Sequence, residues 1–224
     1  MKEFDSLVNT VRRLRSPGGC PWDRAQKVKN MENYLLEETY ELIDAIDKKD
    51  LKSVKEELGD IFLILTVIAE MFRQKGNFNL QEVLRSINNK LIFRHPHVFG
   101  SKKLNNKEEV LKHWVNNKAK QKKRHSIKDR LAQAAPALLL ADIFFKELSY
   151  LRGDKFKKES RQKLYAELKA KVRTLEKSND SEKLLSGIVI DLANIAHRRG
   201  INLETHTRRA ILKQAEKSNY RSYK

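Results

Sequence analysis

Turn-forming residues are scarce in this chain, and that scarcity restricts its fold more than any other feature of the sequence. The chain has 8 Gly and 4 Pro among 224 residues, well below their share in average proteins. A sandwich or barrel of many short strands needs turn residues at frequent intervals. No segment shows sustained alternation of apolar and polar residues. We therefore expect an all-α fold built from long helices.

Apolar residues recur at helical spacing along most of the chain, beginning with a segment over 4–15. Ser16-Pro17-Gly18-Gly19 ends this segment, and residues 20–23 are expected to continue as a loop. Residues 94–100 are expected to form a second loop. The pattern predicts further helices over 29–48, from the N-cap Asp50 to Gly76, from the N-cap Asn79 to Phe93, from about Asn106 past Trp114, over 136–151, 156–176 and 181–197, and from the N-cap Asn202 onward.

The chain is strongly basic, with 47 Lys or Arg against 29 Asp or Glu and a formal net charge of +18. Such a charge suggests an anionic partner, either a nucleotide or a nucleic acid. The alternative is a solvated basic surface, because the Lys residues are scattered along the sequence. The densest basic run, Lys118–Arg130, has seven Lys or Arg and one acid, and we interpret its end, 124–130, as a connector between two domains.

Three features of the sequence favour a cytoplasmic protein. The single cysteine, Cys20, cannot form an internal disulfide, which fits a reducing compartment. The first residues lack the apolar core of a signal peptide. The longest apolar stretch, 61–69, is far shorter than the roughly 20 residues that span a bilayer, so no membrane partner is expected.

The segment 37–60 reverses the basic trend, with nine acids against four Lys. It contains two pairs of acids three residues apart, one pair on each of two predicted helices: Glu38 with Glu41, and Glu57 with Asp60. Residues at this spacing share one face of a helix. Because the connection between the two helices is short, they should pack antiparallel, and the four carboxylates should converge between them.

Four converging carboxylates are costly without a cation, because like charges at close range repel one another. A hard divalent cation removes this cost, and Mg²⁺ takes oxygen ligands while keeping waters and substrate phosphates in its shell. Gly59 fits this interpretation, since a missing side chain between two ligands would let the helices approach closely. The alternative is a solvated acidic face, as in most Glu-rich helix turns. The second acid pair, beside apolar residues, favours the metal site.

Four motifs occur in order in the first part of the chain: Cys20-Pro21-Trp22-Asp23, Glu37-Glu38-x-x-Glu41, Glu57-Leu58-Gly59-Asp60 and Arg94-His95-Pro96-His97-Val98-Phe99-Gly100. Through them the chain, over roughly 1–123, resembles the MazG nucleoside triphosphate pyrophosphohydrolases of the all-α NTP pyrophosphatase superfamily. The resemblance implies hydrolysis of NTPs or dNTPs to monophosphates and diphosphate, as house-cleaning of the nucleotide pool.

The same resemblance implies a role for each acid by its position in the motifs. The ion would be Mg²⁺, with Mn²⁺ as a substitute, and its ligands would be Glu38, Glu41, Glu57 and Asp60. Glu37 or Glu38 would orient the attacking water, and Glu56 is a further candidate for a supporting role beside the ligands. A metal-activated water needs no nucleophilic side chain.

The phosphate end of such a substrate needs cations. Lys90 and Arg94 are four residues apart near the end of a predicted helix, so they share a face and could hold a polyphosphate. The family pattern has a Lys and an Arg at this spacing, which supports this assignment over a solvated surface pair. Trp114 offers a ring for base stacking, or equally a core side chain, and Lys118 offers a further cation.

The second half, 131–224, is interpreted as a degenerate MazG-like helical repeat of the catalytic domain, 1–123. Its apolar stretch Ile190–Ala196 matches Leu63–Ala69 at an offset of 127 residues. The positions that correspond to the acids of the first half hold Tyr165, Ala166, Lys169, Leu184 and Gly187. A repeat without these carboxylates cannot hold Mg²⁺ in the same way. We expect it to pack against the first half or a second subunit, in a homodimer.

The leading hypothesis is therefore an enzyme, a Mg²⁺-dependent nucleoside triphosphate pyrophosphohydrolase. A narrower alternative within the superfamily is a pyrimidine dNTP pyrophosphatase, although the motif at 94–100 favours MazG. A hypothesis of another class is a nucleic-acid-binding or regulatory helical module, motivated by the net charge of +18 and the basic run. The acid-rich segment argues against phosphate-backbone binding at that place, so nucleic acid is a partner that the sequence allows but does not favour.

Overall fold

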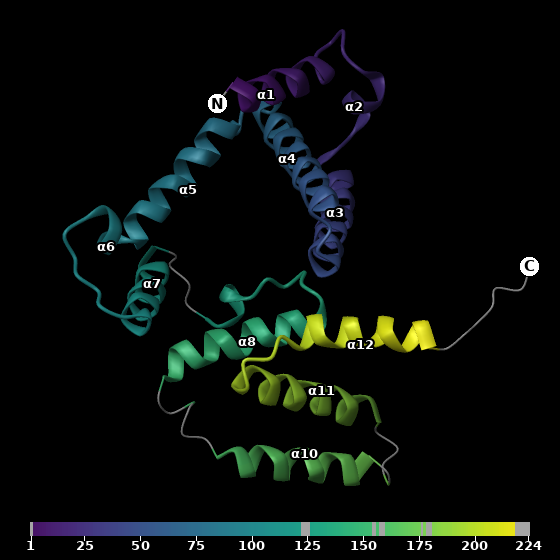
Figure 1. Cartoon of the computed structure of the whole chain (residues 1–224), viewed down its shortest axis with the longest axis vertical. Coiled ribbons are helices and arrows are strands. Elements are labelled where there is room, and N and C mark those ends of the chain that lie inside the picture. The colour runs from purple at the N-terminus through teal and green to yellow at the C-terminus, as the bar shows by residue number, and fades with distance from the viewer. Residues whose placement is uncertain are drawn as a thin grey trace, which may run out of the picture. The chain divides into compact units, whose positions relative to one another are not determined.

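The computed structural model describes residues 2–121, 126–153, 156, 160–175, 177 and 181–217. Helices are the only regular secondary structure that these residues form, which confirms the predicted all-α class (Figure 1). The chain divides into two compact units, Met1–Asn105 and Asn106–Lys224. Among the described helices, none combines the length and apolar character that crossing a bilayer requires.

The first unit is organised around one long helix, α4. The antiparallel partner α3 makes the most extensive contact with it, and α1 and α5 also pack against it. The helices of this unit are α1 (Lys2–Leu14), α2 (Pro21–Ala25), α3 (Val28–Lys48), α4 (Leu51–Gln74), α5 (Leu80–Arg94) and α6 (Pro96–Phe99). Every long helix predicted in this part of the sequence is therefore present.

The turn between α3 and α4 occupies only two residues. Lys49 ends α3 in the left-handed conformation, with φ of 57°. Asp50 then caps α4, because its Oδ1 accepts hydrogen bonds from the backbone N–H groups of Lys52 at 3.0 Å and Ser53 at 3.3 Å. So short a turn leaves the two helices antiparallel and side by side, as predicted.

The core of the first unit lies between α3 and α4. Its buried residues are Met31, Ile64 and Met71, with Tyr34 and Val67 packed against them. A buried ion pair stabilises the C-terminal end of α4.

That ion pair centres on Glu70, whose carboxylate is almost fully buried. It accepts two hydrogen bonds of 2.7 Å from Arg73, one to each oxygen. Arg12 on α1 approaches the same carboxylate, with its Nε 3.7 Å from Oε2. Burying the charge of Glu70 is tolerable because two guanidinium groups face it.

Two segments predicted as loops are short helices instead. Residues 20–23 enter α2, and residues 94–100 include α6. In both cases a proline, Pro21 or Pro96, occupies the first helical turn, where its missing N–H would have no partner anyway. The predicted capping box of α5 is confirmed, since Asn79 and Glu82 bond each other's backbone N–H groups at 3.0 and 2.8 Å.

The expectation for Gly59 is wrong. A Cβ built on this residue would meet no atom within 4 Å, so the glycine is not needed for a close approach of α3 and α4. The physical reason is helical geometry. Residue 59 is two positions from Glu57, and residues two apart do not face the same way on a helix.

The second unit is organised around α11 in a similar way. This helix packs against α10, α8 and α12, and α12 also packs against α8. The described helices are α7 (Lys107–Gln121), the 3₁₀ helix η1 (Lys128–Arg130), α8 (Ala137–Arg152), α10 (Arg161–Leu175), α11 (Ser181–Arg198) and α12 (Leu203–Lys217). The pairings of α11 with α8, α10 and α12 parallel those of α4 with α1, α3 and α5.

The core of the second unit is aromatic. Phe145, Phe156 and Ala193 are buried together. His197 on α11 lies against both Phe rings and pairs with Asp142 on α8, with 2.9 Å between its Nδ1 and Oδ1. This pair joins α8 to α11 as the Arg12–Glu70 pair joins α1 to α4.

The predicted connector 124–130 is described only from residue 126 onward. Arg130 at its end is half-buried, and its Nη1 lies 3.4 Å from Oε2 of the buried Glu147 on α8. The last residue of the connector is thus attached to the second unit. The predicted domain boundaries themselves, and the descent of the second half from a repeat, stay predictions.

Candidate active site

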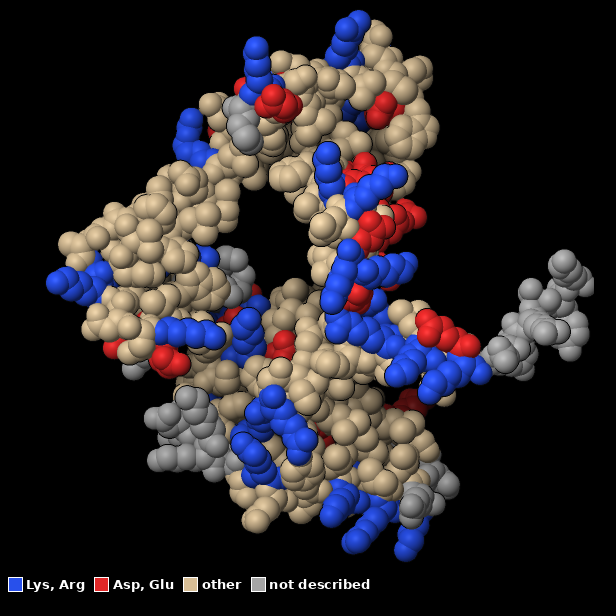
Figure 2. Space-filling model, in the orientation of Figure 1, with Lys and Arg blue, Asp and Glu red and all other residues tan. Residues whose placement is uncertain are grey.

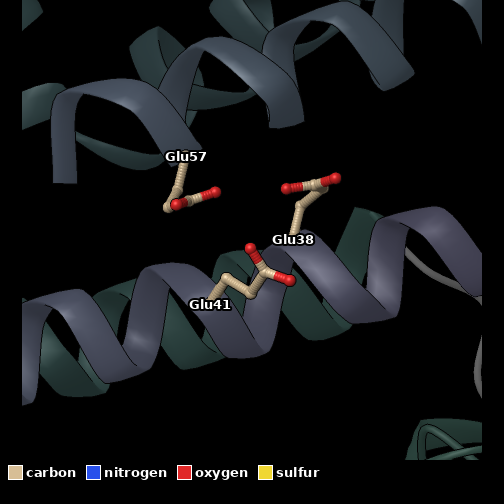
Figure 3. A group of neighbouring side chains, drawn as sticks. All are labelled: Glu38, Glu41 and Glu57. Atoms are coloured by element: carbon tan, nitrogen blue, oxygen red, sulfur yellow. The ribbon is translucent and has the colours of Figure 1, made fainter. Parts of the chain in front are cut away.

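Three carboxylates meet between α3 and α4 in the first unit. Glu38 and Glu41 extend from α3 toward Glu57 on α4 (Figure 3). One oxygen from each residue lies within 4.8 Å of the others, and we call this group the carboxylate cluster. Acidic side chains gather over α3 and α4 on the surface as well (Figure 2). The convergence predicted from the spacing of the acids is therefore present for these three residues.

The cluster shifts the protonation of Glu38. The pKa of this carboxyl is raised above its ordinary value of 4.5, first by partial burial and then by a hydrogen bond with Glu57. The charges of Asp60, Glu41 and Glu57 raise it further. Each cause disfavours the ionised form of Glu38. A positive ion at the cluster would favour the ionised form of Glu38.

Asp60 lies beside the cluster but outside the group of three. It lines a cavity of about 210 Å³ together with Glu38. We call this the aromatic cavity, because its lining is mostly apolar and contains two rings. Its lining residues are Leu14, Trp22, Asp23, Gln26, Met31, Tyr34, Glu38, Asp60, Leu63, Ile64 and Val67.

A second cavity, of about 470 Å³, borders the other members of the cluster. Glu41 and Glu57 line it. Its remaining lining is mostly polar, with Lys48 paired to Asp44 at 2.5 Å. The cluster thus has an apolar cavity next to Glu38 and a polar one next to Glu41 and Glu57.

The chemistry of the cluster is that of hard oxygen donors. Carboxylates crowded together are stabilised by a divalent cation that takes several oxygen ligands. The donor set fits Mg²⁺ or Mn²⁺, which prefer carboxylate and water oxygens.

The other predicted site residues lie on different elements. Glu37 and Glu56 are exposed, on α3 and α4. Lys90 is exposed on α5, and Arg94 is half-buried at the end of that helix. The helix that carries both residues, α5, packs against α4, which carries Glu57.

Two predicted substrate-binding residues belong to the second unit. Trp114 is half-buried on α7. Lys118 lies on the same helix, and its side chain is outside the described residues.

The aromatic cavity was not predicted from the sequence. Trp22 and Asp23 belong to the Cys20–Asp23 motif, but nothing in that motif alone places them near Glu38. The signal that could have found them is a tryptophan three residues after the turn residues 16–19, because connecting segments of this kind run over the protein surface.

The second unit has a lysine close to the position predicted to correspond to Asp60. The side chain of Lys171 lies 3.6 Å from where a Cβ on Gly187 would be. Its ammonium pairs with Asp191 at 2.7 Å. The ammonium of Lys171 thus neutralises the charge of Asp191 beside this position.

The sequence is similar to known proteins over most of its length. The model of the MazG nucleotide pyrophosphohydrolase domain matches residues 26–99, which contain the carboxylate cluster. The MazG nucleoside triphosphate pyrophosphohydrolase/pyrophosphatase of Thermotoga maritima is 33% identical over 219 residues, covering 96% of this chain and 83% of that protein.

Two further relatives match part of the chain. The nucleoside triphosphate pyrophosphohydrolase of Escherichia coli K12 is 39% identical over 145 residues, which is 63% of this chain and about half (55%) of the relative. A MazG-related protein from Thermotoga maritima, solved by crystallography, is 25% identical with a TM-score of 0.45, covering 53% of this chain and 98% of its own. By the similarity over 96% of the chain and by the matched domain, the chain belongs to the MazG family of nucleotide pyrophosphohydrolases.

Proposed function

We propose that this protein hydrolyses nucleoside triphosphates, or their deoxy forms, to monophosphates and diphosphate. The observation that carries the proposal is the convergence of Glu38, Glu41 and Glu57 within 4.8 Å in a chain of the MazG family. Relatives from Thermotoga maritima and Escherichia coli carry this activity in their names. The proposed biological role is removal of unwanted nucleotides from the cytoplasmic pool.

The carboxylates would hold Mg²⁺, with Asp60 as the fourth ligand beside the cluster. When bound, the ion would neutralise charge that develops on the phosphate oxygens. Glu38, or its exposed neighbour Glu37, would accept a hydrogen bond from the attacking water and orient it. Glu38 is the better placed of the two, since it belongs to the cluster and lines the aromatic cavity.

The polyphosphate would be bound by cations from outside the cluster. Lys90 and Arg94 share a face of α5, and Lys118 is a further candidate on α7. Trp114 stays a candidate for contact with the nucleoside. These assignments rest on motif position and spacing.

A homodimer is part of the proposal because α5 leaves an apolar face open. Leu84, Ile87 and Leu91 are 43%, 46% and 47% exposed, and Phe62 on α4 is 52% exposed. Apolar side chains that follow one another along a helix in this way mark an interaction surface. Replacing Ile87 with Asp should shift the protein from dimer to monomer in sedimentation velocity runs, and an unchanged mass would contradict this interface.

The function is tested by measuring diphosphate release from a panel of natural and oxidised NTPs and dNTPs. Wild-type protein should release diphosphate only with a divalent cation. Glu57→Ala should lose at least about 100-fold in kcat/KM with an unchanged helical circular dichroism spectrum, because it removes a ligand of the cluster. Glu32→Ala is the matched control, since Glu32 is exposed on α3 and pairs with Lys29 away from the cluster. Equal activity of Glu57→Ala and wild type would refute the proposed site.

A further inference from the structure

The positive charge of this chain is concentrated in its second unit. Residues 106–224 contain 29 Lys or Arg against 14 Asp or Glu, a net charge of +15, whereas residues 1–105 contain 18 against 15. So large a charge on one unit attracts anionic partners. The carboxylate cluster belongs to the first unit, so a metal site there does not account for the charge of the second.

Basic side chains form a stripe along the outer face of α10. Every fourth residue from 161 to 177 is basic except for one tyrosine, and we call this series the α10 stripe: Arg161, Tyr165, Lys169, Arg173 and Lys177. Residues four apart follow one another on one face of a helix. The four basic residues are exposed, and Tyr165 is half-buried. From Arg161 to Arg173 the stripe is about 18 Å long, at the helical rise of ~1.5 Å per residue.

The opposite face of α10 packs on α11. Leu164 is buried there, and Lys171 pairs with Asp191 of α11 at 2.7 Å. The one acid within α10, Glu167, has Lys163 and Lys171 as its neighbours four residues away, and its carboxylate lies 3.9 Å from Lys163. Neither of these lysines belongs to the α10 stripe. Figure 2 shows Lys and Arg side chains projecting into solvent along the edge where Figure 1 places α10.

The first end of the stripe extends onto the end of α11. Arg199 is exposed there, and its Nη2 donates a hydrogen bond of 2.6 Å to the hydroxyl of Tyr165. The same guanidinium lies 5.9 Å from the centre of the Tyr165 ring. Arg161 and Arg198 line a small cavity together with these two residues. Three guanidinium groups and a tyrosine hydroxyl thus gather at this end, and side chains of these types are the ones that contact nucleic-acid phosphates.

We propose that the α10 stripe, together with Arg199, binds the phosphodiester backbone of a nucleic acid. A row of cations along one helix face suits a ligand with a row of anions, whereas a single nucleotide would reach only part of it. A helix that lies on a membrane instead presents large apolar side chains to the lipid, and the apolar face of α10 is packed on α11. This binding is independent of the proposed hydrolysis.

The test is fluorescence anisotropy of the full chain with a labelled DNA of about 20 nucleotides, single-stranded or duplex, in EDTA. EDTA removes divalent cations, so the ends of the DNA cannot bind through a metal at the carboxylate cluster. Both forms should bind, since both carry the same backbone. The affinity should fall at least about 10-fold between roughly 50 and 200 mM NaCl, because binding releases counterions.

Two double variants separate the stripe from the overall charge. Lys169→Gln with Arg173→Gln should weaken binding about 10-fold or more and lower the slope of log affinity against log salt by roughly 1.5–2. Lys213→Gln with Lys217→Gln is the matched control, because these lysines are also exposed and four residues apart, on α12. The control should lose less than about threefold. Circular dichroism melts check that both variants fold like wild type.

Four outcomes would overturn the inference. They are no DNA binding by wild-type protein in EDTA, binding that does not depend on salt, equal losses in the two double variants, and binding to phosphatidylglycerol vesicles but not to DNA. Equal losses would mean that the diffuse charge of the unit, not the stripe, attracts DNA. Because the assay involves no metal and no hydrolysis, a failure here leaves the proposed function standing, and a failure of diphosphate release leaves this inference standing.

Discussion

The carboxyl groups of Glu38 and Glu57 meet across the antiparallel helices α3 and α4, with an oxygen of each within 4.8 Å of the other. Burial first, and then its acidic neighbours, raise the pKa of Glu38, so this carboxyl keeps its proton to a higher pH than a free one. A metal ion that takes both oxygens must displace this proton, so metal binding and protonation compete at the same atoms. The affinity for Mg²⁺ should therefore rise with pH until the cluster is fully ionised.

Glu38→Gln should stabilise the metal-free protein at neutral pH. The pKa of Glu38 is raised in the folded state, so its contribution to stability is present at low pH and is lost as the pH rises through the raised value. At pH 7 the folded protein bears a charge that its neighbours repel, and glutamine removes that charge. With EDTA present, the melting temperature at pH 7 should increase by roughly 1–3 °C.

The pH dependence of the rise in melting temperature shows whether Glu38→Gln acts by removing charge repulsion or by improving the packing. Below pH 4.5, the ordinary pKa of the group, the Glu38→Gln advantage should disappear because the wild-type carboxyl is protonated as well. In Glu32→Gln, which changes an exposed acid on the same helix, the melting temperature should not rise at either pH. An advantage of Glu38→Gln that persists at pH 4 would show that charge repulsion is not its cause.

Lys90→Ala and Arg94→Ala should each lower kcat/KM by roughly 10-fold or more. The polyphosphate is charged in the ground state and in the transition state, so the loss can appear in KM, in kcat or in both. Arg85→Ala is the matched control, because Arg85 is also exposed on α5. If all three variants match wild type in steady-state kinetics, the phosphate contacts are elsewhere.

Gly19→Ala should destabilise the protein by about 1–3 kcal/mol. A Cβ on Gly19 would overlap the carbonyl oxygens of Arg13 and Leu14 at the end of α1, and backbone atoms cannot move aside cheaply. Gly18→Ala makes the same chemical change one residue earlier, where a Cβ meets no atom within 4 Å. Urea denaturation of the two variants measures the difference, and equal midpoints would contradict the close approach of this turn to α1.

The second unit alone should show no Mg²⁺-dependent stabilisation. In the fragment Asn106–Lys224 the candidate position beside Gly187 is taken by Lys171, which is paired with Asp191. Thermal melts with Mg²⁺ and α,β-methylene ATP should therefore leave its melting temperature unchanged, while that of the full chain rises. A rise in the isolated fragment, with a helical spectrum confirming that it folds, would overturn the interpretation of this half as degenerate.

The features predicted correctly from the sequence depend on spacing over a few residues. Asp50 and Asn79 cap helices because their side chains reach backbone groups two or three positions ahead. Glu38 and Glu41 share a face because they are three residues apart on α3, and the short turn after α3 brings Glu57 next to them.

The features that were missed depend on segments meeting in space. The aromatic cavity combines side chains from α1, α2, α3 and α4, and no spacing in the sequence encodes that meeting. The segment 20–23 was expected to continue the loop after residues 16–19, but Pro21 fits the first turn of a helix, where its missing N–H needs no partner. The expectation for Gly59 was wrong because a residue that lies between two acids in the sequence does not lie between their side chains on the surface of the helix.

One pair of a basic and an acidic side chain links an outer helix to the central helix in each unit, and the two pairs have the opposite order of base and acid. In the first unit the base, Arg12, is on the outer helix α1 and the acid, Glu70, is on the central helix α4. In the second unit the acid, Asp142, is on α8, and the base, His197, is on the central helix α11. If α8 docked on α4 during folding, the carboxyl groups of Asp142 and Glu70 would meet. If α1 docked on α11, the guanidinium of Arg12 would meet the imidazole of His197. A chain with two similarly built halves risks exchanging helices between them, and this reversal of sign penalises the wrong pairings.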